Sequence, residues 1–359
     1  MKRKVAVVAV AVGSSLLLMG AGKSDDAKLL EEARQFFKPL PKVAESKQNP
    51  VTETKVQLGK MLYYEPRLSK SGLISCNTCH NLATYGVDNL PTSVGHRWQL
   101  GPRNAPTTLN AALHVAQFWD GRAKDVEEQA KGPVVNPIEM AMDSPEEVVK
   151  RLKSIPEYVK LFKKAFPKDR EPLNYDNVAK AIAAFERTLM TPSRFDKFLQ
   201  GDLNALTKKE KEGLRTFIRV GCASCHNGPA LGGTTFTRFG IVESYWNETR
   251  NYVTLDKPTM PMDVGKFAVT HKEEDLYVFK VPSLRNISRT YPYFHDGSVW
   301  NLEDAVQVMA KVQLGKKLSK KEVESIVAFL KALDGEIPKH ALELPVLPPS
   351  TKGTPKPVR

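Results

Sequence analysis

Apolar residues recur at the spacing of an α-helix over much of the chain, and residues suited to helix capping stand just before several of these runs. Ser144 precedes one run together with Pro145, and Ser319 precedes another with Glu322 three residues later, the spacing of a capping box. Residues 174–189 carry a third apolar stripe. This pattern predicts a mainly α-helical protein.

The helical pattern is organised in two similar halves. Residues 56–68 and 210–221 are both basic and amphipathic, both lead into a glycine-containing turn, and both are followed by a pair of cysteines. The two copies indicate two domains of related design, which we expect at residues 28–190 and 195–340. Pro192 marks the expected linker between them.

Two stretches depart from the helical pattern. Residues 234–281 hold glycines, prolines and short β-prone runs, so we expect long loops there, with little β structure beyond a small hairpin. The tail, residues 345–359, contains five prolines. We expect it to be extended or disordered.

The first residues have the form of an export signal. Lys2, Arg3 and Lys4 precede an apolar run that ends near small residues, which predicts a signal peptide over residues 1–22 and a periplasmic location. The run is short for a membrane span, so we expect none after removal of the leader, although an uncleaved leader would act as an anchor. Removal takes away three cations and lowers the formal net charge from +13 to +10. No motif supports nucleic-acid binding.

The four cysteines of the sequence fall into two C-x-x-C-H motifs. Cys76 and Cys79 are followed by His80, and Cys222 and Cys225 by His226. In this motif the two thiols form thioethers with heme, and the adjacent histidine binds the iron. The sequence therefore predicts two covalently bound heme c groups. A zinc site would have to bring together two cysteine pairs far apart in the sequence, and redox-active dithiols are the other alternative.

Further motifs, in their order along residues 58–333, resemble the bacterial diheme cytochrome c peroxidases. The resemblance implies two cytochrome c-like helical domains, each around one covalent heme, with long loops and little β structure. Besides the two heme motifs, it is carried by residues 58–62 (Leu-Gly-Lys-Met-Leu), 103–107 (Arg-Asn-Ala-Pro-Thr), 118–122 (Phe-Trp-Asp-Gly-Arg), 136–140 (Asn-Pro-Ile-Glu-Met), 282–286 (Pro-Ser-Leu-Arg-Asn) and 292–297 (Pro-Tyr-Phe-His-Asp-Gly).

The resemblance implies that the heme of the first domain is the one that reacts with peroxide. His80 is the implied proximal ligand, and His96 is implied to close the other face in the oxidised state and to leave when the second heme is reduced. Glu139 is the implied acid-base residue, and Gln129 the amide that accompanies it. Taken alone, His96 would be a solvated loop histidine and Glu139 an ordinary residue of a first helical turn.

In the second domain, the resemblance implies an electron-accepting heme with His226 and Met309 as axial ligands. A His/Met pair raises the potential of a heme. Met260 and Met262 lie in a proline-rich segment that could also present sulfur to iron. Trp119 matches the tryptophan that lies between the two hemes in this family.

The same resemblance implies a calcium ion between the domains. Asn104 would supply a side-chain oxygen, and Thr290 and Pro292 would supply backbone carbonyls. Hard oxygen ligands suit Ca²⁺. The sequence has no acidic calcium-binding loop, so this site depends on the resemblance alone.

The activity implied by the resemblance is reduction of hydrogen peroxide to water with electrons from a small cytochrome c or copper protein, by a homodimer. Two rival functions remain. One is a diheme electron-transfer cytochrome without peroxidase activity. The other is the related diheme enzyme that matures a quinone cofactor, which has tyrosine in place of the distal methionine and lacks the closing histidine; Met309 and His96 both argue against it.

Overall fold

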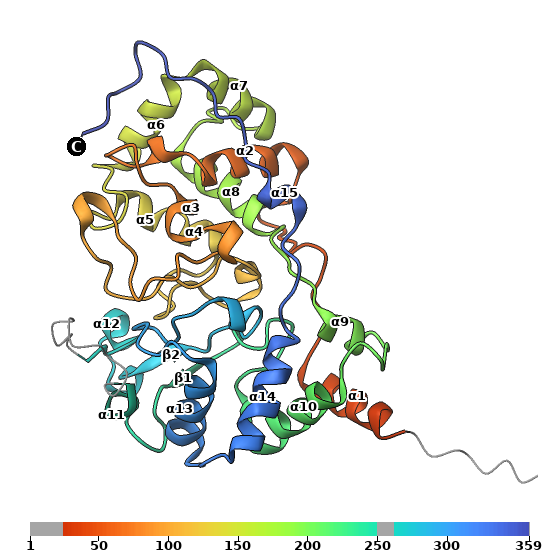
Figure 1. Ribbon diagram of the computed structural model, residues 1–359. Coiled ribbons are helices and arrows are strands. Elements are labelled where there is room, and N and C mark those ends of the chain that lie inside the picture. Colours follow the sequence, from red (N-terminus) through yellow and green to blue (C-terminus); the bar gives the residue numbers. More distant parts are fainter. Residues whose placement is uncertain (1–23, 250–261, 359) are drawn as a thin grey trace, which may run out of the picture.

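The computed structural model describes residues 24–249 and 262–358, and it forms two helical lobes connected by extended segments (Figure 1). The first lobe comprises residues 53–190, and the second lobe residues 193–335. The expected signal peptide lies outside the described residues, as does Met260. Within the described ranges, no helix has the length and apolar character that crossing a membrane requires.

Helices dominate both lobes, as expected, and short 3-10 turns connect many of them. The 3-10 turns are η1 (Pro66–Leu68), η2 (Leu82–Thr84), η3 (His96–Trp98), η4 (Ala111–Leu113), η5 (Cys222–Ser224), η7 (Glu273–Asp275) and η8 (Ile287–Arg289). The α-helices are α1 (Asp25–Phe36), α2 (Glu53–Tyr63), α3 (Cys76–Cys79), α4 (Val126–Gln129), α5 (Gly132–Val135), α6 (Pro145–Lys153), α7 (Pro156–Ala165), α8 (Tyr175–Glu186), α9 (Arg194–Leu199), α10 (Lys208–Val220), α11 (Tyr245–Thr249), α12 (Phe267–Thr270), α13 (Leu302–Leu314), α14 (Lys320–Lys331) and α15 (Lys339–Leu342).

The helix starts predicted from capping residues are confirmed. The side chain of Ser144 accepts the Glu147 N–H at the start of α6. Ser319 and Glu322 form the reciprocal capping box of α14. These caps satisfy N–H groups that have no partner within the helix, which is why the local sequence is enough to specify them.

Both lobes use the same close crossing of two helices. Gly59 of α2 lies so near the backbone of Ala181 in α8 that a Cβ atom would come within 1.8 Å of its carbonyl oxygen. Gly213 of α10 meets Ser325 of α14 in the same way, at 1.9 Å. Only glycine permits this approach. Each lobe thus contains one pair of helices that cross at a glycine.

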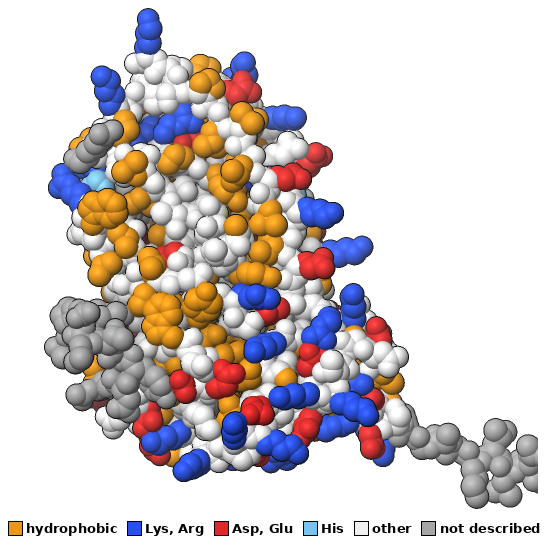
Figure 2. All heavy atoms as spheres, in the orientation of Figure 1, with side chains coloured by type: hydrophobic (Ala, Val, Ile, Leu, Met, Phe, Trp, Pro, Cys, Tyr) orange, Lys and Arg blue, Asp and Glu red, His pale blue; other side chains and the backbone are white. Residues whose placement is uncertain are grey.

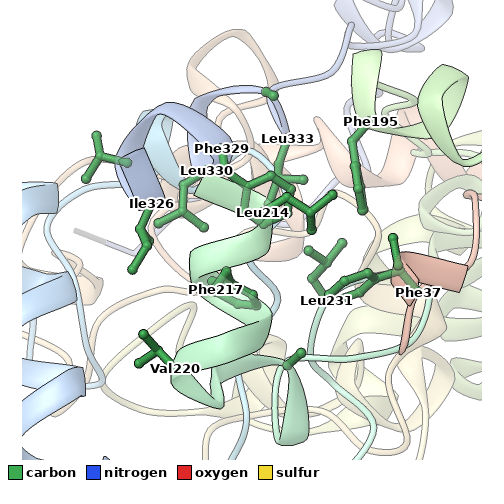
Figure 3. Close-up of a cluster of buried hydrophobic side chains, with 14 of the residues drawn as sticks. Phe37, Phe195, Leu214, Phe217, Val220, Leu231, Ile326, Phe329, Leu330 and Leu333 are labelled. Carbon is green, nitrogen blue, oxygen red and sulfur yellow. The ribbon is translucent and has the colours of Figure 1, made fainter. Parts of the chain in front are cut away.

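Each lobe has its own hydrophobic core. In the second lobe, α10 directs Leu214 and Phe217 toward Phe329 of α14, and Phe37 and Phe195 close the other side (Figure 3). The core of the first lobe is built mainly from α2, α7 and α8.

The two ends of the chain cross over to the opposite lobes. Leu29, Leu30 and Phe37, in and just after α1, are buried in the core of the second lobe, and Ala341 is buried in that of the first. This packing differs from the expected division at residues 28–190 and 195–340. The reason is that the apolar face of α1 can be buried only by long-range contacts, which sequence order does not reveal.

The remaining segments are extended. Strands β1 (Phe236–Arg238) and β2 (Val278–Lys280) pair antiparallel, so the β structure expected within residues 234–281 is present, although some forty residues separate its strands. The tail is extended along the first lobe, where Arg67 donates to the carbonyl of Pro348 and the Val358 N–H donates to the carbonyl of Lys70.

A buried polar junction joins the lobes at the linker. The hydroxyl oxygen of Thr191 accepts hydrogen bonds from Asn110 of the first lobe and Asn286 of the second, both at 2.8 Å. The Asn104 N–H also donates to the carbonyl of His295 at 2.8 Å. Figure 2 shows apolar side chains gathered over the first lobe and near the junction, whereas basic and acidic side chains intermix over the visible face of the second lobe.

Candidate functional site

The second C-x-x-C-H motif opens onto a cavity of about 210 Å³. Helix α10 ends at Val220, and the left-handed conformation of the capping residue Gly221 turns the chain directly into Cys222. Cys222, Cys225 and His226 line this cavity, and Met309 lines it from helix α13. The structure thus brings together all four residues predicted for the second heme.

The imidazole of His226 has the orientation and charge that suit an iron ligand. Its Nδ1 lies 3.2 Å from the carbonyl oxygen of Leu231, so Nδ1 carries the proton and Nε2 has a free lone pair. Burial lowers the pKa of His226 to about 4, which keeps the ring neutral at pH 7. Met262, the rival sulfur donor, packs instead against the cluster around Tyr245.

The first C-x-x-C-H motif forms helix α3, which is capped by Ser75. The carbonyl of His80 accepts a hydrogen bond from the hydroxyl of Tyr63 at 2.6 Å, which ties the motif to helix α2. The Nδ1 atoms of His80 and His96 are both buried without a hydrogen-bond partner among the described residues. An unpaired buried ring nitrogen leaves each imidazole with the capacity to bind a metal or another absent group.

Glu139 lies near this motif, at the edge of a second cavity of about 370 Å³. Burial raises the pKa of Glu139, while the charge of Arg122 and a 2.7 Å hydrogen bond from Asn136 partly offset that rise. Burial also raises the pKa values of the Cys76 and Cys79 thiols, and the negative charge of Glu139 adds to both shifts. The carboxylate is therefore within electrostatic range of both cysteines.

His96 is held against the segment that carries Glu139. The His96 N–H donates to the carbonyls of Ile138 and Glu139 at 2.9 and 2.8 Å. The two residues that follow, Arg97 and Trp98, adopt positive φ angles of 54° and 62°, which are unfavourable for non-glycine residues. The loop therefore contains local backbone strain beside the predicted acid-base residue.

Two polar residues of this cavity were not assigned a role from the sequence, although both lie in the motifs quoted above. Asn136 donates to Glu139, and Arg122 lines the same cavity with its guanidinium 3.4 Å from the ring centre of Phe118. Their place in the Asn-Pro-Ile-Glu and Phe-Trp-Asp-Gly-Arg runs is the signal that could have found them. Gln129, by contrast, ends helix α4 and does not line the cavity.

Trp119 and the predicted calcium ligands lie along the second heme cavity. Asn104, Trp119, Thr290 and Pro292 all line it. The indole N–H of Trp119 donates to the carbonyl of Asn104 at 2.9 Å. In the described part of the chain, no cluster of three or more His, Cys, Asp or Glu residues could hold a metal ion. A calcium ion here would thus depend on amide and backbone oxygens.

The residues of both motifs fit covalent heme. All four cysteines lie in the described part of the chain, and none of them forms a disulfide. Around the second motif, the thiols, a neutral imidazole and a thioether converge on one cavity lined mainly by apolar residues. This is the donor set that a covalently attached, six-coordinate heme requires.

Comparison with known proteins agrees with this geometry. Residues 53–204 match the family model described as di-haem cytochrome c peroxidase. The chain is 49% identical to cytochrome c551 peroxidase of Pseudomonas aeruginosa over 96% of this chain and 97% of that one. It is 47% identical to cytochrome c551 peroxidase of Nitrosomonas europaea, over 95% and 96% of the two chains.

A solved structure shows the same fold. It is described as a MauG-like protein associated with microbial copper homeostasis, and it superposes with a TM-score of 0.73 at 28% identity over 86% of this chain and 97% of its own. From the sequence matches and the shared fold, the chain belongs to the di-haem cytochrome c peroxidase family and is an oxidoreductase that acts on peroxide.

Proposed function

We propose that the chain is a periplasmic peroxidase that reduces hydrogen peroxide to two waters, taking two electrons from a small donor protein and two protons from solvent. The observation that carries this proposal is the half-buried carboxyl of Glu139, which lines a cavity beside Arg122 and accepts a hydrogen bond from Asn136. Its pKa is raised, and its charge raises the pKa of the Cys76 and Cys79 thiols. When bound, the two hemes supply single-electron transfer at the second motif and a binding position for peroxide at the first.

Glu139 moves the protons. Cleavage of the O–O bond requires a group that accepts a proton from one peroxide oxygen and returns it to the departing oxygen. A raised pKa brings a carboxyl nearer to the operating pH, where it exchanges protons most efficiently. Asn136 orients the carboxyl through its 2.7 Å hydrogen bond, and Arg122 limits the rise in pKa.

His96 controls access to the first site. Its ring is buried and its backbone N–H bonds to Glu139, so departure of the ring from the first heme position would also move the segment that carries the acid-base group. The strained residues that follow His96 favour such a change, because strain held in the closed loop is released on opening.

The second site receives the electrons. His226 and Met309 form the axial pair, and Trp119 of the first lobe lines the same cavity. The donor is a small cytochrome c or copper protein, and the basic balance of the chain favours an acidic face on it. Asn104, Thr290 and Pro292 hold a calcium ion between the lobes, and the enzyme acts as a homodimer.

One experiment separates this function from that of a pure electron carrier. Calcium-loaded protein is reduced by one electron, the spin state of the first heme is followed by spectroscopy, and peroxide consumption is measured. We expect a change to five-coordinate heme together with turnover. If both hemes stay low-spin and peroxide persists, the chain is an electron-transfer cytochrome and Glu139 has only a structural role.

A further inference from the structure

Lys280 is a buried cation that has no anionic partner in the described ranges 24–249 and 262–358. It is the last residue of strand β2, it is only 5% exposed, and its side chain lines the second heme cavity. Within the described part of the chain, its Nζ has one hydrogen-bond partner, the Nδ1 of His114 at 3.3 Å. Among the residues that the structure describes, no carboxylate forms an ion pair with Lys280.

One ring nitrogen of His114 also lacks a hydrogen-bond partner among the described residues. Its Nε2 is buried with no hydrogen bond in the described structure, and its ring also lines the cavity. The ring packs so tightly against Gly233 that a Cβ atom at that position would lie 2.1 Å from it. His114 and Lys280 are therefore fixed together, each with unused hydrogen-bonding capacity.

Burial of an unpaired ammonium group is unfavourable, so such a group either loses its proton or binds an anion. Burial alone lowers the pKa of Lys280 to about 8, and no neighbouring charge raises it. A bound carboxylate would remove this penalty and keep the ammonium charged.

The surroundings define which carboxylate fits. The cavity is lined largely by apolar side chains, with Cys222 and Cys225 among its walls. Heme joined through its vinyl groups to these thiols fills the same cavity and carries two propionate groups on the opposite edge of the ring. The propionates are thus the anions that a buried cation in this cavity can meet.

We propose that Lys280, supported by His114, binds a propionate of the heme attached at Cys222 and Cys225. This inference rests on the proposed heme attachment at that motif. The backbone N–H of Lys280 donates to the carbonyl of Trp119 at 2.8 Å, so the same residue fixes the heme edge relative to the tryptophan between the sites. A cation beside the propionate also favours the reduced heme and so raises its potential.

The test compares Lys280→Met with two controls in the heme-loaded protein. Lys280→Arg keeps the charge, and Lys272→Met removes an exposed lysine of the same lobe. The readouts are heme stoichiometry, the midpoint potential of each heme by spectroelectrochemical titration, and the propionate bands in the redox-induced infrared difference spectrum.

We expect K280M to bind two hemes and to shift a propionate band. The substitution should lower the midpoint potential of the second heme by much more than that of the first. K272M should change none of these, and K280R should retain the potential while shifting the band. An unchanged second-heme potential and infrared spectrum in K280M, or an effect confined to the first heme, overturns the proposal.

If K280M does not yield holoprotein, the infrared bands of K280R decide, because an unshifted propionate band would exclude contact with residue 280. Failure of the underlying proposed function is recognised separately, since the unaltered protein would then lack a second covalent heme.

Discussion

The backbone N–H of His96 donates a 2.8 Å hydrogen bond to the carbonyl oxygen of Glu139. The residue proposed to close the first site and the residue proposed to move its protons are therefore mechanically linked. Gly95 strengthens the link, because a Cβ atom there would lie 2.0 Å from the Ile138 carbonyl oxygen. Opening the His96 loop without a shift of the Glu139 segment would break these contacts.

Substitution of Glu139 by Gln should lower kcat by roughly 100- to 10,000-fold while leaving the heme spectra unchanged, because glutamine keeps the shape of the side chain and cannot accept the proton. The measurement is peroxide turnover by the half-reduced enzyme. Glu128→Gln is the matched control, since Glu128 lines the same cavity but pairs with Lys131 at 3.1 Å. Equal losses in both variants would show that Glu139 has no specific role.

Replacement of His96 by Ala should make the fully oxidised protein react with peroxide without prior reduction. The buried ring would no longer close the first site. Rapid mixing of oxidised protein with one equivalent of peroxide measures this, and His271→Ala, at an exposed histidine of the second lobe, is the control. A variant that still requires reduction would contradict the gating role of His96.

Met309→Leu should lower the potential of the second heme and slow electron uptake from a donor, because loss of thioether ligation removes the stabilisation of the reduced iron. Potentiometric titration of both hemes tests this. Met262→Leu is the matched control, since Met262 packs in the cluster around Tyr245 and not in the heme cavity. If M262L lowers the potential and M309L does not, the ligand assignment is wrong.

Glu186 should make stability depend on pH. Burial raises its pKa from 4.5 to about 8, and the charge of Glu127 adds to the rise. The unfolded chain therefore loses the Glu186 proton at a lower pH than the folded chain does. The free energy of unfolding should fall as pH rises from about 4.5 to 8, at up to about 1.4 kcal/mol per pH unit. Below pH 4.5 the Glu186 carboxyl is protonated in both the folded and the unfolded chain, so this loss of stability is absent.

Denaturant unfolding of Glu186→Gln at several pH values measures this dependence. The variant should lose the slope and be more stable than the parent protein near pH 8, because it has no buried proton to release. Glu32→Gln, at an exposed position of α1, should leave the slope unchanged. Identical slopes in the parent protein and E186Q would show that Glu186 is not the titrating group.

The sequence alone determined the features that depend on local order. Neighbouring residues specify the two C-x-x-C-H motifs, the caps at Ser144 and Ser319, and the helical stripe of residues 174–189, because caps and helical stripes involve groups within about one to four positions. The mainly helical fold follows from the same patterns.

Only the tertiary structure decided which distant groups meet. Asn136 and Arg122 join Glu139, α1 packs in the second lobe, Lys280 lies against His114, and Gln129 stays outside the cavity of Glu139. Burial, shifted pKa values and unpaired polar atoms arise from contacts between segments far apart in the chain, and the free energy that fixes those contacts comes from packing of whole helices.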